Sequence, residues 1–138
     1  MAAEPVGTLT APAEPASLDR VHALLEAVWT AHEDVLPADR MPFALAVTEV
    51  AGNIVQHAGD GHPLAFSLHV DVRPEVLTAE FEDPGRRVDV DLTAVSLPGA
   101  AAESGRGLAL ALRCVDHLEY RRDGGTNRWR LLRRRADS

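Results

Sequence analysis

Residues 44–58 read ALAVTEVAGNIVQHA, an almost wholly apolar segment that carries two strongly polar side chains, Glu49 and Asn53. A spacing of four residues places these two side chains on the same face of a helix, one turn apart. An apolar helix of this kind is normally buried, and a buried polar group without a hydrogen-bond partner costs about 1–3 kcal/mol. The carboxylate and the amide therefore need partners, and a bound ligand or metal is one way to supply them.

The composition fits a single domain over residues 1–138, with a core from about residue 6 to residue 133 and flexible ends. Apolar residues make up 46% of the chain, but no uninterrupted apolar run is long enough to span a membrane, and the first residues do not resemble a signal peptide. The single cysteine, Cys114, excludes an internal disulfide and suits a reducing compartment. A cytoplasmic location is therefore expected.

The charged residues exclude several kinds of chemistry. The net charge of −7 argues against nonspecific binding of nucleic acid. All 14 basic residues are arginine, and without lysine the chain cannot form a Schiff base or build a P-loop. The arginine-rich segment 128–135 alternates with Trp and Leu, which favours a strand with one solvated face over a phosphate-binding patch. The histidines show no zinc-binding spacing, and Ser104 is not part of a GxSxG motif.

Hydrophobic periodicity predicts the order of the elements. It places strands at residues 6–10, 64–72, 76–82, 117–122 and 126–132, and helices at residues 17–31, from about residue 37 to a turn at 59–61, and at 108–115. Short turns join the last four strands in pairs. The expected fold is therefore α+β, with two or three helices packed on one face of a mainly antiparallel sheet.

Residues 84–104 show no sustained period apart from a short strand or turn at 88–92. So long a loop inside a compact domain is typical of a functional lid. It ends in Gly105-Arg106-Gly107, directly before an apolar helical run. Backbone N–H groups at a glycine-rich helix start, with the helix dipole behind them, are suited to phosphate oxygens.

Three polar side chains fit a site of the same kind. Asp83 follows a strand and precedes Pro84-Gly85, where its carboxylate can accept a hydrogen bond from an exocyclic amine. Asn53 can coordinate Mg²⁺ through its carbonyl oxygen. Glu49 can orient or deprotonate a nucleophile near a terminal phosphate.

The order and spacing of three short motifs resemble the N, G1 and G2 boxes of the GHKL (Bergerat-fold) ATPases: Glu49-x-x-x-Asn53, Asp83-x-Gly85 and Gly105-x-Gly107-Leu108. From about residue 6 to residue 133, the chain is further similar to the RsbW/SpoIIAB-type anti-sigma factors, which are small serine/threonine protein kinases. The Ala-Val-Thr-Glu-Val core and the closing Gly125-Thr126 contribute to this narrower likeness. The resemblance implies a Bergerat-type sandwich that binds ATP and Mg²⁺.

The resemblance also implies a role for each motif residue. Glu49 would be the catalytic base and Asn53 the Mg²⁺ ligand, while Asp83 would bind the adenine amino group. Glycines would allow close approach of the base and cradle the phosphates, and an arginine would add a charged contact. The full set implied for nucleotide binding is Asn53, His57, Asp83, Gly85, Gly105, Arg106, Gly107, Leu108 and Thr126. His57 falls where the family often has a histidine, with a structural hydrogen bond at a helix end as its alternative role.

The same resemblance implies partners. The substrate would be a serine on an anti-anti-sigma protein with the STAS fold, phosphorylated by in-line transfer from ATP. Phosphorylation would break that complex and free the kinase to hold its sigma factor. The family commonly works as a homodimer. Direct contact with nucleic acid or with a membrane is not expected.

Three readings remain open beside that of an active kinase. The first is a binding module that sequesters a partner and either binds ATP without transferring phosphate or no longer binds ATP. The intact Glu49 favours the kinase, because a pure binder does not need that base. The second is the catalytic domain of a sensor histidine kinase, which is less favoured because no dimerising helix with a phospho-accepting histidine precedes the domain. In the third, the motifs are coincidental in an unrelated α+β domain.

Overall fold

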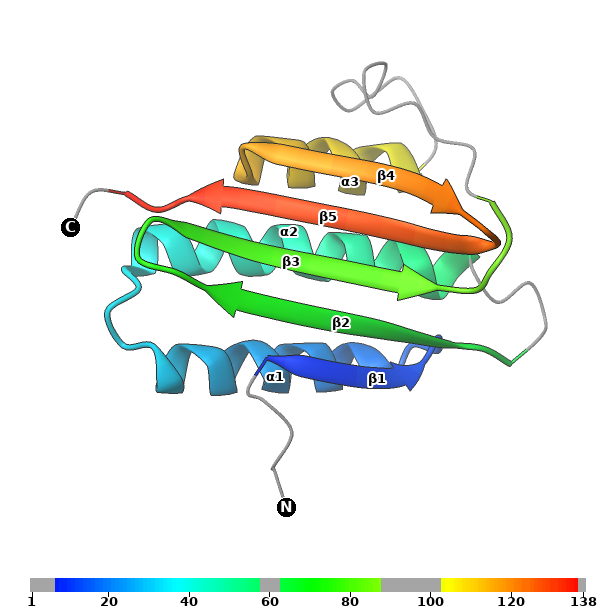
Figure 1. Cartoon of the computed structure of the whole chain (residues 1–138), viewed down its shortest axis with the longest axis horizontal. Coiled ribbons are helices and arrows are strands. Elements are labelled where there is room, and N and C mark those ends of the chain that lie inside the picture. Colours follow the sequence, from blue (N-terminus) through cyan, green and yellow to red (C-terminus); the bar gives the residue numbers. More distant parts are fainter. Residues whose placement is uncertain (1–6, 58–62, 88–102, 137–138) are drawn as a thin grey trace.

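In the computed structural model, which describes residues 7–57, 63–87 and 103–136, helices cover one face of a single antiparallel sheet (Figure 1). The strands are β1 (Thr8–Pro12), β2 (Ala65–Val72), β3 (Val76–Asp83), β4 (His117–Asp123) and β5 (Thr126–Arg134). The helices are α1 (Ser17–Ala31), α2 (Pro37–His57) and α3 (Glu103–Cys114). The strand order is β1-β2-β3-β5-β4. This arrangement confirms the α+β class and the one-sided packing of the helices.

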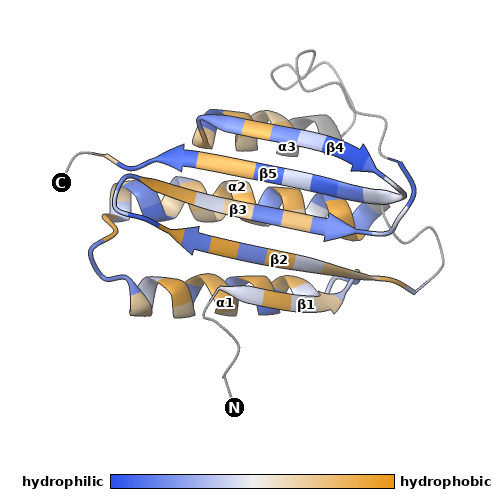
Figure 2. Cartoon of the chain, in the orientation of Figure 1, coloured by the Kyte–Doolittle hydropathy of each residue, from blue (hydrophilic) through white to orange (hydrophobic). Residues whose placement is uncertain are grey.

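The strands alternate between a buried face and a solvated face, as Figure 2 shows along β3 and β5. Phe81 on β3 lies opposite Trp129 on β5, and both side chains are buried against the helices. The outward neighbours Glu82 and Arg128 form an exposed ion pair at 3.0 Å. This period of two fixes which residues face the helices, because a shift of one residue would exchange the two faces.

Helix α2 supplies much of the core, since its sheet-facing side is entirely apolar. Phe43, Val47 and Val50 have no exposed surface, and Ile54 is 1% exposed. The spacing of these side chains is that of one helix face. The buried side of α2 therefore fixes its orientation and presents Glu49 and Asn53 along another side.

Pro42 lies inside α2 and has no N–H to donate to the carbonyl of Ala38. Arg133 at the end of β5 supplies the missing donor, because its Nη2 donates to that carbonyl at 3.2 Å. The Nε atom of Arg133 also lies 3.1 Å from Oδ1 of Asp39, whose side chain is 1% exposed. This arginine therefore ties the end of the sheet to the first turns of α2.

Some boundaries differ from those predicted. Helix α3 begins at Glu103 rather than at residue 108, because glycines are tolerated in a helix at a cost of about 1 kcal/mol each. Strand β1 begins at residue 8 rather than 6, directly after Gly7. This glycine has φ of 101°, and a Cβ atom there would lie 2.4 Å from the carbonyl oxygen of Val70. The turn expected at 59–61, the possible strand at 88–92 and most of the expected lid lie outside the described residues.

Candidate nucleotide site

The predicted motif residues come together at one end of the molecule. Figure 1 shows the end of β3, the C-terminal part of α2 and the start of α3 at the same end of the sheet. Helix α2 lies between α1 and α3, so its side chains reach both neighbours. Residues that are far apart in the sequence therefore meet at this end.

The carboxylate of Glu49 lies directly against Gly107. A Cβ atom on Gly107 would be 2.6 Å from Oε2 of Glu49, closer than any ordinary contact. Glycine at this position therefore lets the start of α3 approach the half-buried carboxylate. The motif of Glu49 and Asn53 is therefore in contact with the glycine motif at the start of α3. Glu49 and Gly107 are 58 residues apart in the sequence (107 minus 49).

Asn53 lies one turn beyond Glu49 on α2 and is 7% exposed. Its Nδ2 atom is buried and has no hydrogen-bond partner among the described residues. Rotation of the amide by 180° exchanges its nitrogen and oxygen, so the unpartnered position can present either a donor or a carbonyl ligand. A buried amide without a partner is costly, and a bound group in this place would remove that cost.

Asp83, the last residue of β3, is 2% exposed, and its carboxylate accepts hydrogen bonds from one backbone donor and one side-chain donor. The backbone N–H of Gly85 donates to its Oδ1 at 2.8 Å, which closes the short turn after the strand. The side chain of Asn127 on β5 donates to the same oxygen at 3.0 Å. Among the described residues both donors reach Oδ1, and Oδ2 accepts no hydrogen bond from them.

Asn127 is a part of this site that the sequence motifs did not reveal. Its Nδ2 atom also donates to the carbonyl of Arg86 at 2.8 Å, and its Oδ1 accepts from the hydroxyl of Tyr120 and, at 2.9 Å, from Nη1 of Arg122. Nη1 of Arg122 further donates to the carbonyl of Gly85 at 2.8 Å. The signal for Asn127 was present as a polar residue at an inward position of an alternating strand, where Trp129 and Leu131 follow.

The other predicted residues are placed as follows. Leu108 packs in the core at 3% exposed, and Gly105 and Arg106 lie in the first turns of α3. His57 ends α2. The side chains of Arg106 and His57 are outside the described part of the structure. Thr126 begins β5 on the solvated face of the sheet, where it lines a shallow hollow with Ser67 and Glu82.

The described residues hold no group of three or more His, Cys, Asp or Glu side chains able to bind a metal ion. Magnesium in nucleotide sites is bound through one or two protein ligands together with phosphate oxygens and water. The buried amide of Asn53 beside the carboxylate of Glu49 fits that mode of binding, whereas a metal cage made wholly of protein does not fit this part of the chain.

The comparisons with known proteins bear on the family and the fold of the chain. The model of the histidine kinase-like ATPase domain matches residues 11–132. The structure of the RsbU and RsbW domains of Rv1364c from Mycobacterium tuberculosis is similar, with a TM-score of 0.64, 16% identity, and coverage of 97% of this chain and 34% of that chain. The histidine kinase domain of the blue-light activated histidine kinase EL346 from Erythrobacter litoralis is also similar, with a TM-score of 0.52, 18% identity, and coverage of 83% and 59%.

At sequence identities this low, the two structures show only that the fold is shared. This chain spans less than two thirds of the length of each of them. No curated protein shows significant sequence similarity to the chain. None of the described helices is long and apolar enough to cross a membrane.

Proposed function

Because the chain belongs to the family of histidine kinase-like ATPase domains, we propose that it binds ATP with Mg²⁺ and acts as a serine/threonine protein kinase. The observation that carries the proposal is the contact between Glu49 and Gly107. It brings an acidic side chain suited to base catalysis to the glycine-rich start of a helix, where phosphate oxygens are favoured. The unpartnered amide of Asn53 stands one turn away.

In the proposed site, some residues act at the phosphates of the nucleotide and others bind its adenine base. When bound, ATP would supply the phosphoryl group, which the serine oxygen would take as the bond to the β-phosphate oxygen breaks and ADP leaves, and Mg²⁺ would neutralise the charge on the phosphates. Asn53 would hold the cation through its amide oxygen. Glu49 orients the serine hydroxyl and accepts its proton, which moves to a carboxylate oxygen. Asp83 accepts a hydrogen bond from the adenine amino group, with Gly85 giving the base room.

The remaining predicted residues complete the proposed site. Gly105 and Gly107 cradle phosphate through backbone N–H groups, Arg106 adds a charged contact, and Leu108 seats the helix start in the core. His57 and Thr126 stay as predicted contributors near the nucleotide.

For the biological role, we propose an anti-sigma factor that phosphorylates a STAS-type anti-anti-sigma protein and sequesters a sigma factor, as a homodimer. The support is the fold shared with a structure that contains an RsbW domain, together with the intact Glu49. A module that sequesters a partner without using ATP is the alternative.

The test is calorimetric titration with ATP at millimolar Mg²⁺. We expect saturable binding by the wild type, loss of binding in Asp83→Asn and loss of the Mg²⁺ dependence in Asn53→Ala. Asp83→Asn is a fair probe because it keeps Oδ1 as an acceptor for Gly85 while removing the charge. Glu80→Gln, on the solvated face of β3, is the matched control and should bind as the wild type does.

Glu49→Gln should bind ATP normally and fail to transfer phosphate to a candidate anti-anti-sigma protein. Absence of ATP binding at millimolar nucleotide would sink the kinase proposal and leave the sequestering module.

A further inference from the structure

Helix α2 is apolar on almost every side, yet its neighbours leave part of it uncovered. Its sheet-facing side chains are fully buried, whereas Met41 is 74% exposed and Leu45 is 39% exposed. A helix that is apolar all round is normally buried on all sides. The outer face of α2 around Met41 and Leu45 is therefore an apolar surface without a partner in the described part of the chain.

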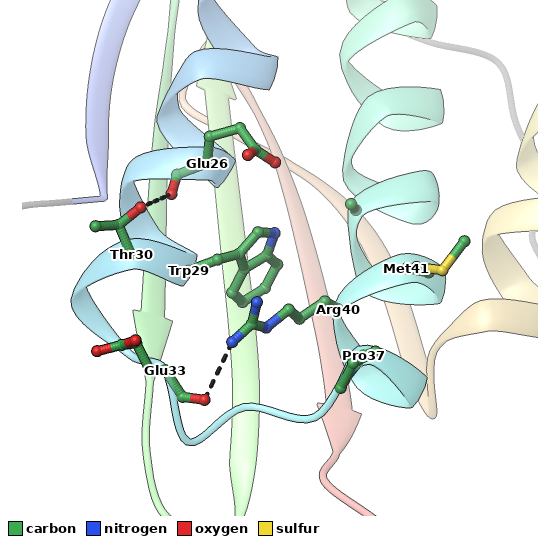
Figure 3. Close-up of a pocket in the computed structure, with 8 residues that line it drawn as sticks. Glu26, Trp29, Thr30, Glu33, Pro37, Arg40 and Met41 are labelled. Atoms are coloured by element: carbon green, nitrogen blue, oxygen red, sulfur yellow. Dashed lines mark hydrogen bonds between the residues drawn. The ribbon is translucent and has the colours of Figure 1, made fainter.

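A groove, which we call the α1/α2 groove, runs between this face and α1. It consists of two adjoining hollows of about 550 Å³ and 270 Å³ that share Glu26, Trp29 and Ala44. Figure 3 shows Trp29 reaching from α1 toward α2, with Glu26 and Arg40 on either side of its ring. Along α2 the lining extends from Pro37 to Thr48, which is roughly 17 Å of helix at 1.5 Å per residue.

The groove has an acidic rim on the side of α1. Glu26 and Glu33 both line it and are exposed, and neither forms an ion pair with a described side chain. Arg40 lines the groove too, but its Nε donates to the carbonyl of Val35 at 2.7 Å and its Nη2 to that of Glu33 at 3.1 Å. Its guanidinium carbon lies 6.0 Å from the centre of the Trp29 ring. Two glutamates against one arginine leave the lining of the groove with a net charge of −1.

We propose that the α1/α2 groove docks an amphipathic helix of a partner protein, with aliphatic side chains against Ala44 and Leu45, over the buried Trp29 at the floor of the groove, and Arg or Lys side chains facing Glu26. About three helical turns match the length of the groove. The proposal deepens the partner-binding part of the proposed function and rests on it for its biological meaning, but docking itself needs no nucleotide. A second copy of the chain is a poor occupant of this groove, because it would bring two acidic rims together. The proposed homodimer would therefore form through another surface.

The test uses a designed helical peptide of about 15 residues, with leucine at i, i+3, i+4 and i+7 and arginine on the flanking positions. A twin peptide carries glutamate in place of each arginine. The chain has two methionines and two tryptophans, so its NMR spectra contain only two methionine methyl signals and two indole N–H signals. One of each pair belongs to Met41 and to Trp29. Trp129 is 1% exposed and lies in the sheet, where it serves as the internal reference.

We expect the arginine peptide to shift the Met41 and Trp29 signals saturably and to bind at least tenfold more tightly than its twin. Leu45→Glu should abolish the shifts, and Glu26→Gln should weaken binding severalfold in low salt. The matched control is Leu110→Glu on α3, since Leu110 is 43% exposed against 39% for Leu45. This control variant should bind the arginine peptide as the wild type does.

Equal binding of the two peptides, no binding of either, or an equal loss in Leu110→Glu would overturn the proposal. A shift of the Met41 signal with protein concentration alone would assign the groove to a second copy instead and would also overturn it. ATP is titrated into the same samples, so failure of nucleotide binding is seen separately from failure of peptide docking. A circular dichroism melt of Leu45→Glu shows whether that variant is folded.

Discussion

Asn127 connects three parts of the chain through a single side-chain amide that has no exposed surface. Its nitrogen donates to Asp83 and to the carbonyl of Arg86, and its oxygen accepts from Tyr120 and Arg122. A carboxylate that receives fixed donors on one oxygen presents the other oxygen in a fixed direction. We therefore regard Asn127 as a positioning residue for the adenine end of the proposed site.

Asn127→Ala should weaken ATP binding about tenfold or more, because a hydrogen bond to a charged group contributes about 1.5–3 kcal/mol. Calorimetry measures the loss, and the variant should lose far less affinity for tripolyphosphate, which lacks the base. Arg130→Ala is the control, since Arg130 lies on the solvated face of β5 and outside the proposed site. Equal losses of affinity in Arg130→Ala and Asn127→Ala would refute the positioning role of Asn127.

Gly107→Ala should reduce phosphotransfer about tenfold to a hundredfold while the protein remains folded. The new methyl group would lie 2.6 Å from Oε2 of Glu49, and a flexible carboxylate can move away at little cost to folding. The displaced carboxylate no longer meets the serine hydroxyl. The measurement is the initial rate of phosphate transfer under saturating ATP.

Gly52→Ala on α2 is the matched control for Gly107→Ala, because a Cβ atom there meets nothing within 4 Å. It should leave the rate unchanged and raise stability by about 0.5–1 kcal/mol through helix propensity. A rate that is the same in Gly107→Ala and Gly52→Ala would refute the importance of the contact with Glu49.

At the scale of single residues, the sequence motifs assigned Glu49 and Gly107 to one site, and the structure brings these two residues into contact, but the motifs did not reveal Asn127. The glycine motif is local, so its spacing can be read directly. Asn127 acquires its role only when β5 pairs with β3 and sets it opposite Asp83. That pairing is a tertiary event that no short motif encodes.

At the scale of elements, Arg133 connects two parts of the fold, because it holds the end of β5 to the first turns of α2. Arg133→Ala should lower the free energy of unfolding by about 2–4 kcal/mol, since it leaves the buried carboxylate of Asp39 without its ion-pair partner and the carbonyl of Ala38 without a donor. Urea denaturation measures this change.

Arg134→Ala is the control for Arg133→Ala, because Arg134 is the exposed neighbour on the same strand. It should change stability by less than about 0.5 kcal/mol. Equal effects of the two substitutions would show that the contacts of Arg133 do not contribute as described.

The elements themselves were largely predictable, for identifiable physical reasons. Period-two alternation placed β2, β3, β4 and β5 within about two residues of their ends, and the turn at 123–125 was read from its glycines. The start of α3 was placed five residues too late (108 minus 103), because apolar periodicity marks the buried part of a helix and not its backbone beginning. The α1/α2 groove was not predicted, since the apolar sequence of α2 indicated burial on every side.

At the scale of the whole molecule, nucleotide binding should raise the stability of the fold. A ligand present at about 100 times its Kd stabilises the native state by about 2.7 kcal/mol. For a chain of 138 residues this corresponds to a rise in Tm of about 9 °C. A thermal scan with ATP and Mg²⁺ measures it, with Asp83→Asn as the control that should show no rise. A Tm unaffected by ATP in the wild type would contradict the proposed site.

Strand β5 is the last of the described strands along the chain, yet it lies between β3 and β4 in the sheet. A chain emerging from a ribosome therefore carries β3 and β4 with open edges until residues 126–134 are released, and open edges invite wrong pairing. Asp83 can form its hydrogen bond with Asn127 only after the 44 residues that separate them in the sequence have been synthesised. The adenine end of the proposed site is consequently completed late in synthesis, and a nascent chain stalled before β5 cannot use the nucleotide to stabilise its fold.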